Sequence, residues 1–166
     1  NLDYLKTTVK KIYDAVREVE MMIYRQFPTS RLNSLEYKIH TLEELLREYP
    51  NLSSKDRETE AARKYGAIFL IGIGGDLSSG EPHDGRSPDY DDWITPNSDG
   101  YIGLNGDLIL WNPVLETGFE LSSMGIRVDS DSLKKQLAIR GAEDRLNLNF
   151  HKSLVNGELP ASMVEA

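Results

Sequence analysis

The feature that most constrains this chain is a pair of strand-like stretches separated by only a short turn. The stretches span residues 107–112 and 117–128, and Pro113 lies in the turn between them. Strands joined in this way pair antiparallel, because a parallel pair needs a crossover connection that is usually a helix. We therefore predict an α+β fold in which an antiparallel or mixed sheet is flanked by helices, rather than a doubly wound parallel sheet.

Helices account for much of the remaining pattern. Apolar residues recur at helical spacing over 2–27 and predict one amphipathic helix that packs against the core of the same chain. Pro28 ends this helix. Thr41 and Glu44 form a capping box and predict a helix that runs to about Tyr49. Two further strands are expected, at 36–40 and 67–73. Three further helices are expected, at 54–65, 131–140 and 143–155, and Gly66 ends the first of them.

A long irregular stretch, 76–106, precedes the strand pair and is rich in carboxylates. Loops of this length inside a compact domain are uncommon and tend to carry function. Most of these carboxylates are best interpreted as solvated surface, but Mg²⁺ binds one or two carboxylates together with substrate phosphates. Asp107 stands out, because a strand holds a carboxylate more rigidly than a loop does.

Composition argues against several classes of function. The chain has 19 Lys and Arg against 27 Asp and Glu, which argues against a protein that grips nucleic-acid backbones through cationic side chains. The absence of cysteine removes disulfides, thiolate metal sites and a cysteine nucleophile. The longest apolar run, 67–74, is far shorter than the ~20 residues that a membrane-spanning helix needs. We expect a cytoplasmic protein without a membrane or nucleic-acid partner.

The second strand of the pair carries polar groups in an otherwise apolar segment. A buried charge without a partner is costly, so these groups either pair with one another or face a ligand. Strict alternation places Glu120 and Ser122 on one face and Ser123 and Arg127 on the other. Glu120 and Ser123 converge only if a bulge, expected near Gly125, intervenes.

Several segments resemble the ammonia-dependent asparagine synthetases, which are aspartate-ammonia ligases built on the catalytic fold of class II aminoacyl-tRNA synthetases. The longest is the unusual Phe-Glu-Leu-Ser-Ser-Met-Gly-Ile-Arg-Val-Asp of residues 119–129. Its part from Glu120 to Arg127 is also similar to the ATP-site strand of aspartyl- and asparaginyl-tRNA synthetases. The other similar segments, which extend the likeness over essentially the whole chain, are 69–75, 88–93, 104–107, 111–116, 143–146 and 157–160.

The resemblance implies an enzyme that activates the side-chain carboxylate of L-aspartate with ATP. The activation gives a β-aspartyl adenylate and pyrophosphate, and ammonia then displaces AMP to give L-asparagine. ATP and Mg²⁺ are the implied cofactors, and the full-length family member is expected to be a homodimer. The small-molecule partners are therefore L-aspartate, ATP and ammonia.

The same resemblance assigns roles to seven residues of this sequence. Asp107 and Glu120 are implied to hold ATP and Mg²⁺. Tyr90 and Asp91 are implied to form the amino-acid pocket, and Ser122 and Ser123 to line the aspartate or metal site. Arg127 is implied to neutralise a carboxylate or a phosphate. Arg86, Trp93 and Asn112 have a structural interpretation, in a turn or in core packing, that is at least as good as a functional one.

We expect residues 1–166 to form a single domain that corresponds to the central and late part of the family's catalytic domain. By the resemblance, the dimer-forming segments and one phosphate-gripping arginine precede Asn1, and a second nucleotide-binding arginine follows Pro160. The chain is accordingly expected to be truncated and catalytically incomplete. Two alternatives stay open: a non-catalytic paralogue or fragment that binds a nucleotide or amino acid, and, ranked last, aminoacylation of tRNA.

Overall fold

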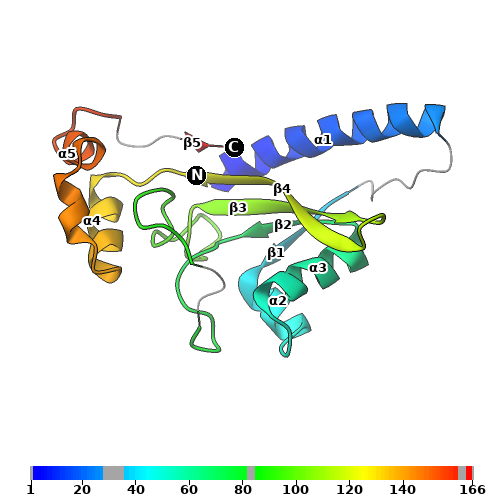
Figure 1. Cartoon of the computed structure of the whole chain (residues 1–166), viewed down its shortest axis with the longest axis horizontal. Coiled ribbons are helices and arrows are strands. Elements are labelled where there is room, and N and C mark those ends of the chain that lie inside the picture. Colours follow the sequence, from blue (N-terminus) through cyan, green and yellow to red (C-terminus); the bar gives the residue numbers. More distant parts are fainter. Residues whose placement is uncertain (1, 28–35, 82–84, 161–163, 166) are drawn as a thin grey trace.

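The computed structural model describes residues 2–27, 36–81, 85–160 and 164–165, and a mixed five-stranded sheet forms its centre (Figure 1). In sheet order, which is also chain order, the strands are β1 (Lys38–Thr41), β2 (Ala67–Ile71), β3 (Asn105–Asn112), β4 (Thr117–Ile126) and β5 (Val164–Glu165). β1 and β2 are parallel, and each later strand is antiparallel to its neighbour. The α+β class and the antiparallel β3–β4 pair are confirmed, whereas the sequence did not indicate β5.

β2 lies between β1 and β3 and is buried along its whole length. Its side chains alternate between two cores: Phe69 packs on one face of the sheet, and Ile68 and Leu70 pack on the other. Figure 1 shows the corresponding layers, with α1 (Leu2–Gln26) over the first face and α2 (Leu42–Glu48) and α3 (Ser54–Tyr65) over the second. The sheet is therefore the middle layer of three, and both cores depend on the same strand.

The predicted helix signals around α2 and α3 are confirmed. The Thr41 hydroxyl accepts from the Glu44 amide at 3.3 Å, and the Glu44 carboxylate accepts from the Thr41 amide at 2.8 Å, which completes the capping box. Gly66 follows α3 with a φ of 82°, a left-handed conformation that favours glycine. These local signals set where the crossover from β1 to β2 begins and ends.

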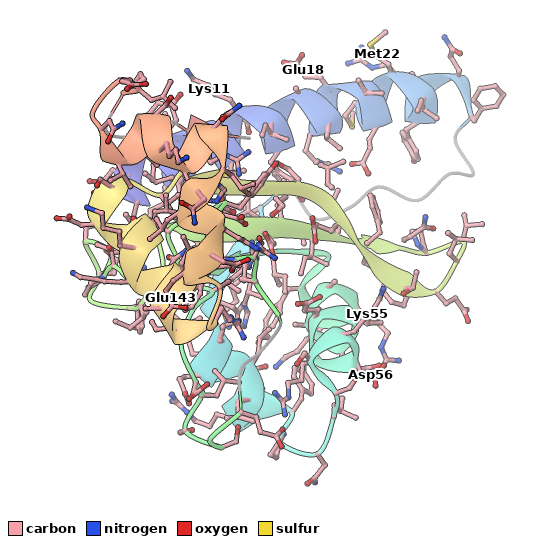
Figure 2. The ribbon with its side chains drawn as sticks, turned by 60° about the vertical axis from the view of Figure 1, so that its left-hand side comes forward. Lys11, Glu18, Met22, Lys55, Asp56 and Glu143 are labelled. Carbon is pink, nitrogen blue, oxygen red and sulfur yellow. The ribbon has the colours of Figure 1, made fainter. Side chains whose placement is uncertain are left out.

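The first half of α1 packs on the sheet, and the second half extends beyond it (Figure 1). Val19 and Ile23 continue the apolar stripe but are exposed, so the helix is confirmed while only part of its stripe is covered. Figure 2 shows Glu18 and Met22 projecting from the side of α1 that faces away from the sheet. Pro28, the expected stop, lies outside the described residues. No helix within the described ranges is long and apolar enough to cross a membrane.

The last part of the chain forms a small helical layer with its own apolar core. Its elements are α4 (Ser130–Ile139), the 3-10 helix η1 (Glu143–Asn147) and α5 (Asn149–Val155). The single helix predicted over 143–155 is wrong, because Leu148 is extended with φ −72° and ψ 150°. The Asn147 side chain donates to the Asp144 carbonyl at 3.2 Å, and such local side-chain bonds compete with a continuous helix.

His40 on β1 is buried next to charged and aromatic neighbours from three elements. Its Nε2 lies 3.5 Å from the Glu48 carboxylate of α2, and its ring lies 4.9 Å from the ring of Tyr65 at the end of α3. Burial lowers the pKa of His40, and the charge of Lys38 on the same strand acts in the same direction. The carboxylates of Glu48 and Glu44 act in the opposite direction without cancelling the effect.

We predict that His40 makes the fold sensitive to mild acid. The unfolded chain takes up a proton near the ordinary pKa of 6.5, whereas the folded chain resists protonation, so stability falls as the pH drops below that value. In His40→Leu the loss of stability between about pH 6.5 and 5 should be smaller. Urea unfolding at a series of pH values measures this. Parallel pH profiles for the two proteins would contradict the prediction.

Candidate functional site

The pairing of β3 with β4 contains one irregularity that brings polar side chains together. Leu108 pairs with Ser122 and Ile109 pairs with Glu120, so Leu121 has no partner in the ladder. The expected bulge is therefore present, but it lies at Leu121 rather than near Gly125. Because of this extra residue, Glu120 and Ser123 lie on the same face of the sheet, which is also the face of Asp107.

Five of the seven residues singled out from the sequence line one cavity on this face. The cavity has a volume of about 240 Å³, and its walls include Tyr90, Asp91, Asp107, Glu120 and Ser123. Asp107 and Glu120 also line an adjoining cavity of about 530 Å³ that extends to the first turns of α3. Asp107 and Glu120 thus lie at the boundary between the two cavities.

Hydrogen bonds from β4 and from the irregular segment hold Asp107. The Ser123 hydroxyl donates to Oδ1 at 2.7 Å across the strand pair, and Arg86 Nη2 donates to Oδ2 at 2.8 Å from the irregular segment. Charge-assisted bonds of this kind are stronger than neutral ones and fix a carboxylate in place. The sequence did not assign Arg86 to the site. The only indication in the sequence was that Arg86 is a basic residue within the acidic segment 76–106.

Asp91 lies between two guanidinium groups. Arg86 Nη1 and Arg127 Nη1 each lie 3.5 Å from a carboxylate oxygen of Asp91. Burial raises the pKa of Asp91, although the charges of Arg127 and Arg86 act in the opposite direction. Arg127 also stacks on Tyr90, with its guanidinium carbon 3.1 Å from the ring centre. Arg127 is therefore brought to the edge of the cavity through Asp91 and Tyr90.

Gly125 on β4 makes room for the Asp91 carboxylate. A Cβ atom at this position would lie 2.5 Å from Cγ of Asp91, closer than real Cβ atoms approach other heavy atoms. The backbones of Asp91 and Arg127 pair as an isolated antiparallel bridge, which brings the irregular segment against the end of β4. The glycine of the Ser-Ser-Met-Gly run is thus required by packing against the site.

The remaining residues discussed above lie elsewhere or have structural contacts. Ser122 is paired with Leu108, which belongs to the core on the α1 side of the sheet, and it does not line the cavity with Ser123. Asn112 accepts the amides of Val114 and Leu115 at 2.9 and 3.0 Å in the β3–β4 turn. The Trp93 ring is buried, and its indole N–H donates to the Ser87 carbonyl at 3.0 Å.

A metal ion would need ligands from a substrate at this site. Within the described residues, no group of three or more Asp, Glu or His side chains has the arrangement of a metal site. Asp107 and Glu120 nevertheless line the same two cavities, and two carboxylates completed by phosphate oxygens are a usual Mg²⁺ environment. The donor set therefore fits a magnesium ion delivered with a nucleotide.

Comparisons with known proteins bear on both family and fold. A family model described as aspartate-ammonia ligase matches residues 1–164. The aspartyl-tRNA synthetase of Entamoeba histolytica aligns over 99% of this chain with 13% identity and a TM-score of 0.61. The asparaginyl-tRNA synthetase of the same organism, in complex with asparaginyl-adenylate, aligns over 92% with 17% identity and a TM-score of 0.56. The fold is thus that of a class II synthetase catalytic core.

The chain is much shorter than these solved structures. It spans 35% of the aspartyl-tRNA synthetase chain and 34% of the asparaginyl-tRNA synthetase chain. At these identities the likeness shows the fold alone, so any activity has to be argued from the family and from the side chains in the cavity.

We predict that Gly125→Ala displaces Asp91 and destabilises the protein by about 1–3 kcal/mol, the usual cost of overpacking. The added Cβ would meet Cγ, Oδ1 and Oδ2 of Asp91. A double-mutant cycle with Asp91→Ala, which removes all three atoms, should therefore recover most of that cost. Urea unfolding of the four proteins measures the coupling, and additive effects of the two substitutions would contradict the predicted contact.

Proposed function

Since the chain belongs to the aspartate-ammonia ligase family, we propose that its cavity takes part in the ATP-dependent amidation of L-aspartate to L-asparagine. The family match confirms the resemblance carried by the sequence motifs. The observation that supports the activity most directly is one cavity lined by Asp107, Glu120 and Asp91, with Arg127 paired to Asp91 at its edge. A magnesium requirement, a cytoplasmic location and a homodimer belong to the same proposal.

The proposed reaction has two steps, each with a defined leaving group. A side-chain carboxylate oxygen of aspartate attacks the α-phosphorus of ATP, and pyrophosphate leaves with the bonding electrons of the broken P–O bond. The nitrogen of ammonia then attacks the activated carbonyl carbon, AMP leaves, and the nitrogen loses a proton. The first step forms a β-aspartyl adenylate, and the second gives asparagine.

Asp107 and Glu120 are proposed to bind the nucleotide through its metal ion. When bound, Mg²⁺ would offset the negative charge of the phosphates. The Ser123 hydroxyl and Arg86 orient the Asp107 carboxylate before any ligand arrives. Such preorganisation reduces the rearrangement that has to accompany binding and reaction.

Asp91 and Arg127 present opposite charges to an amino acid that itself carries both signs. We assign Arg127 to a carboxylate of aspartate, because a guanidinium fork matches carboxylate geometry. Asp91 is assigned to the α-ammonium group, and Tyr90 keeps the Arg127 side chain in place by stacking. The two side chains lie 3.5 Å apart. Bound aspartate would replace this ion pair with two others, one between Asp91 and the α-ammonium group and one between Arg127 and a carboxylate of the substrate.

One of the similar solved structures supports an adenylate at a site of this fold. The asparaginyl-tRNA synthetase from Entamoeba histolytica was solved with asparaginyl-adenylate, which is a mixed anhydride of a carboxylic acid with the phosphate of AMP. We extend this chemistry to the present chain as part of the proposal. The excess of acidic residues, 27 against 19 basic ones, favours a small nucleophile such as ammonia over a tRNA.

The direct test is to supply aspartate, ATP, Mg²⁺ and ammonia and to follow asparagine and AMP by mass spectrometry. The chain is assayed as given and with any flanking sequence that its gene encodes. Equal amounts of both products support the proposal. Binding of aspartate and ATP without either product, in the longer protein as well, would instead support a non-catalytic binding protein.

We predict that Asp107→Asn and Glu120→Gln each lower asparagine formation by roughly 100-fold or more, as expected for groups that stabilise charge in the transition state. Glu143→Gln, in η1 and exposed (Figure 2), is the matched control and should leave the rate unchanged. Binding of Mn²⁺ in the presence of ATP, followed by electron paramagnetic resonance, should weaken in the two cavity variants only. Equal rates in all three variants would rule out the assigned role.

We predict that Arg127→Lys raises the KM for aspartate by about 10- to 100-fold and changes the KM for ATP little, because lysine cannot bind a carboxylate through two parallel bonds. Arg63→Lys, on the exposed surface of α3, is the control. Steady-state kinetics with each substrate varied in turn measures the two constants. An equal rise in both constants would contradict the assignment of Arg127 to the amino acid.

A further inference from the structure

A buried glutamine on α4 makes three hydrogen bonds to the backbone of the segment that carries Asp91. Gln136 is 0% exposed. Its Nε2 donates to the carbonyls of Pro88 and Asp91 at 2.9 and 3.0 Å, and its Oε1 accepts from the amide of Trp93 at 2.8 Å. These contacts cross 43 to 48 residues of sequence. One side chain thus spans the segment 88–93 at both of its ends and at Asp91.

Backbone hydrogen bonds hold the residues next to Asp91 to the end of β4, and the Asp91 carbonyl accepts from Gln136. The Asp92 amide donates to the Ile126 carbonyl at 2.8 Å, and the Val128 amide donates to the Tyr90 carbonyl at 3.0 Å. These two bonds hold the residues on either side of Asp91 against the end of β4. Gln136 holds the Asp91 carbonyl from the opposite side, and thereby sets the rotation of the backbone from which the carboxylate projects.

The chemistry of this position suits glutamine specifically. The site requires one acceptor and two donors at the end of a side chain, which is the inventory of a primary amide. Glutamate retains the acceptor but lacks both donors, and methionine fills a similar volume with neither. Each buried partner left without a bond costs free energy, so the bonds are strong determinants of local geometry.

The helical layer that carries Gln136 is itself fixed independently of the cavity. Leu133 and Leu137 on α4 pack with Leu154 of α5 in the third core. A second contact links this layer to the same segment: Asp89 accepts from Arg145 Nη1 at 3.0 Å and lies 3.1 Å from Nε2 of His151. The segment is thus held on a rigid support, as a preorganised binding group requires.

We propose that Gln136 is a positioning residue that sets the place of the Asp91 carboxylate in the cavity and thereby the affinity for aspartate. The inference rests on the proposed function for the identity of the substrate, but not for the contact itself. Gln136 does not line the cavity. It acts through the backbone of residues 88–93.

Three variants separate positioning from stability. Gln136→Met removes the acceptor and both donors, and Gln136→Glu removes only the donors. Leu154→Ala, in the apolar core beneath α4 and α5, is the control for a general loss of stability. Each is made in the chain with any flanking sequence that its gene encodes, and thermal unfolding reports how far it is destabilised.

The first measurement is aspartate affinity by calorimetry, with ATP affinity measured alongside. Gln136→Met and Gln136→Glu should weaken aspartate binding by about tenfold or more, which the loss of three and two buried hydrogen bonds, respectively, allows. ATP affinity should change less than about twofold. Leu154→Ala should leave both affinities unchanged at a temperature where it is folded. Aspartate binding equal to that of Leu154→Ala would overturn the proposal.

The second measurement does not depend on the substrate. Amide exchange by nuclear magnetic resonance should show faster exchange at Trp93 in Gln136→Met, because its acceptor is lost, and retained protection in Gln136→Glu. A crystal structure of Gln136→Met should show the Asp91 carboxylate displaced by about 1 Å or more, a shift that matters for a reacting geometry. If the unmodified protein fails to bind aspartate, the proposed function fails, and these two results alone decide on the contact. An unmoved carboxylate overturns the inference even where asparagine is formed.

Discussion

The pairing of β3 with β4 is the interaction on which both the sheet and the cavity depend. It joins the buried strand β2 to the later part of the sheet, and it carries the bulge at Leu121. Because side chains alternate along a strand, one extra residue changes which of them share a face. Without it, Glu120 and Ser123 would lie on opposite faces, and only one of them would share a face with Asp107. A single irregularity in one ladder thus creates the acidic wall of the cavity.

The charges in the cavity and at its edge are mutually dependent. Arg86 and Arg127 contribute two positive groups, and Asp91 and Asp107 contribute two negative ones, each largely withdrawn from water. A buried charge without its partner is costly, which is why these four groups form a connected set. They come from the irregular segment and from one end of the strand pair, where β3 begins and β4 ends. The same set offers a ligand both signs of charge, provided that the segment around Asp91 is held in place from the α4 side.

Much of the fold follows from local sequence signals. The capping box of Thr41 and Glu44, the stop at Gly66, and the strand and helix periodicities each act within a few residues of the chain, so they are legible without tertiary structure. The same holds for the short β3–β4 turn, which implied an antiparallel pair. The candidate site residues Asp107 and Glu120 could be singled out because charged groups on an apolar strand are unusual and because the surrounding segments resemble a known family.

The sequence by itself determined most of the elements, their class and the polar groups on the second strand of the pair; tertiary structure alone decided which side chains meet. The bulge lies at Leu121, and Ser122 lies on the face of the sheet opposite the cavity. Arg86 bonds to Asp107, and Gln136 holds the segment 88–93. Tertiary structure also broke the last predicted helix at Leu148. Each of these outcomes except the last depends on a partner at least 11 residues away in the chain, and no pattern of neighbouring residues encodes such a partner. Periodicity determines what a segment becomes, whereas packing determines what it contacts.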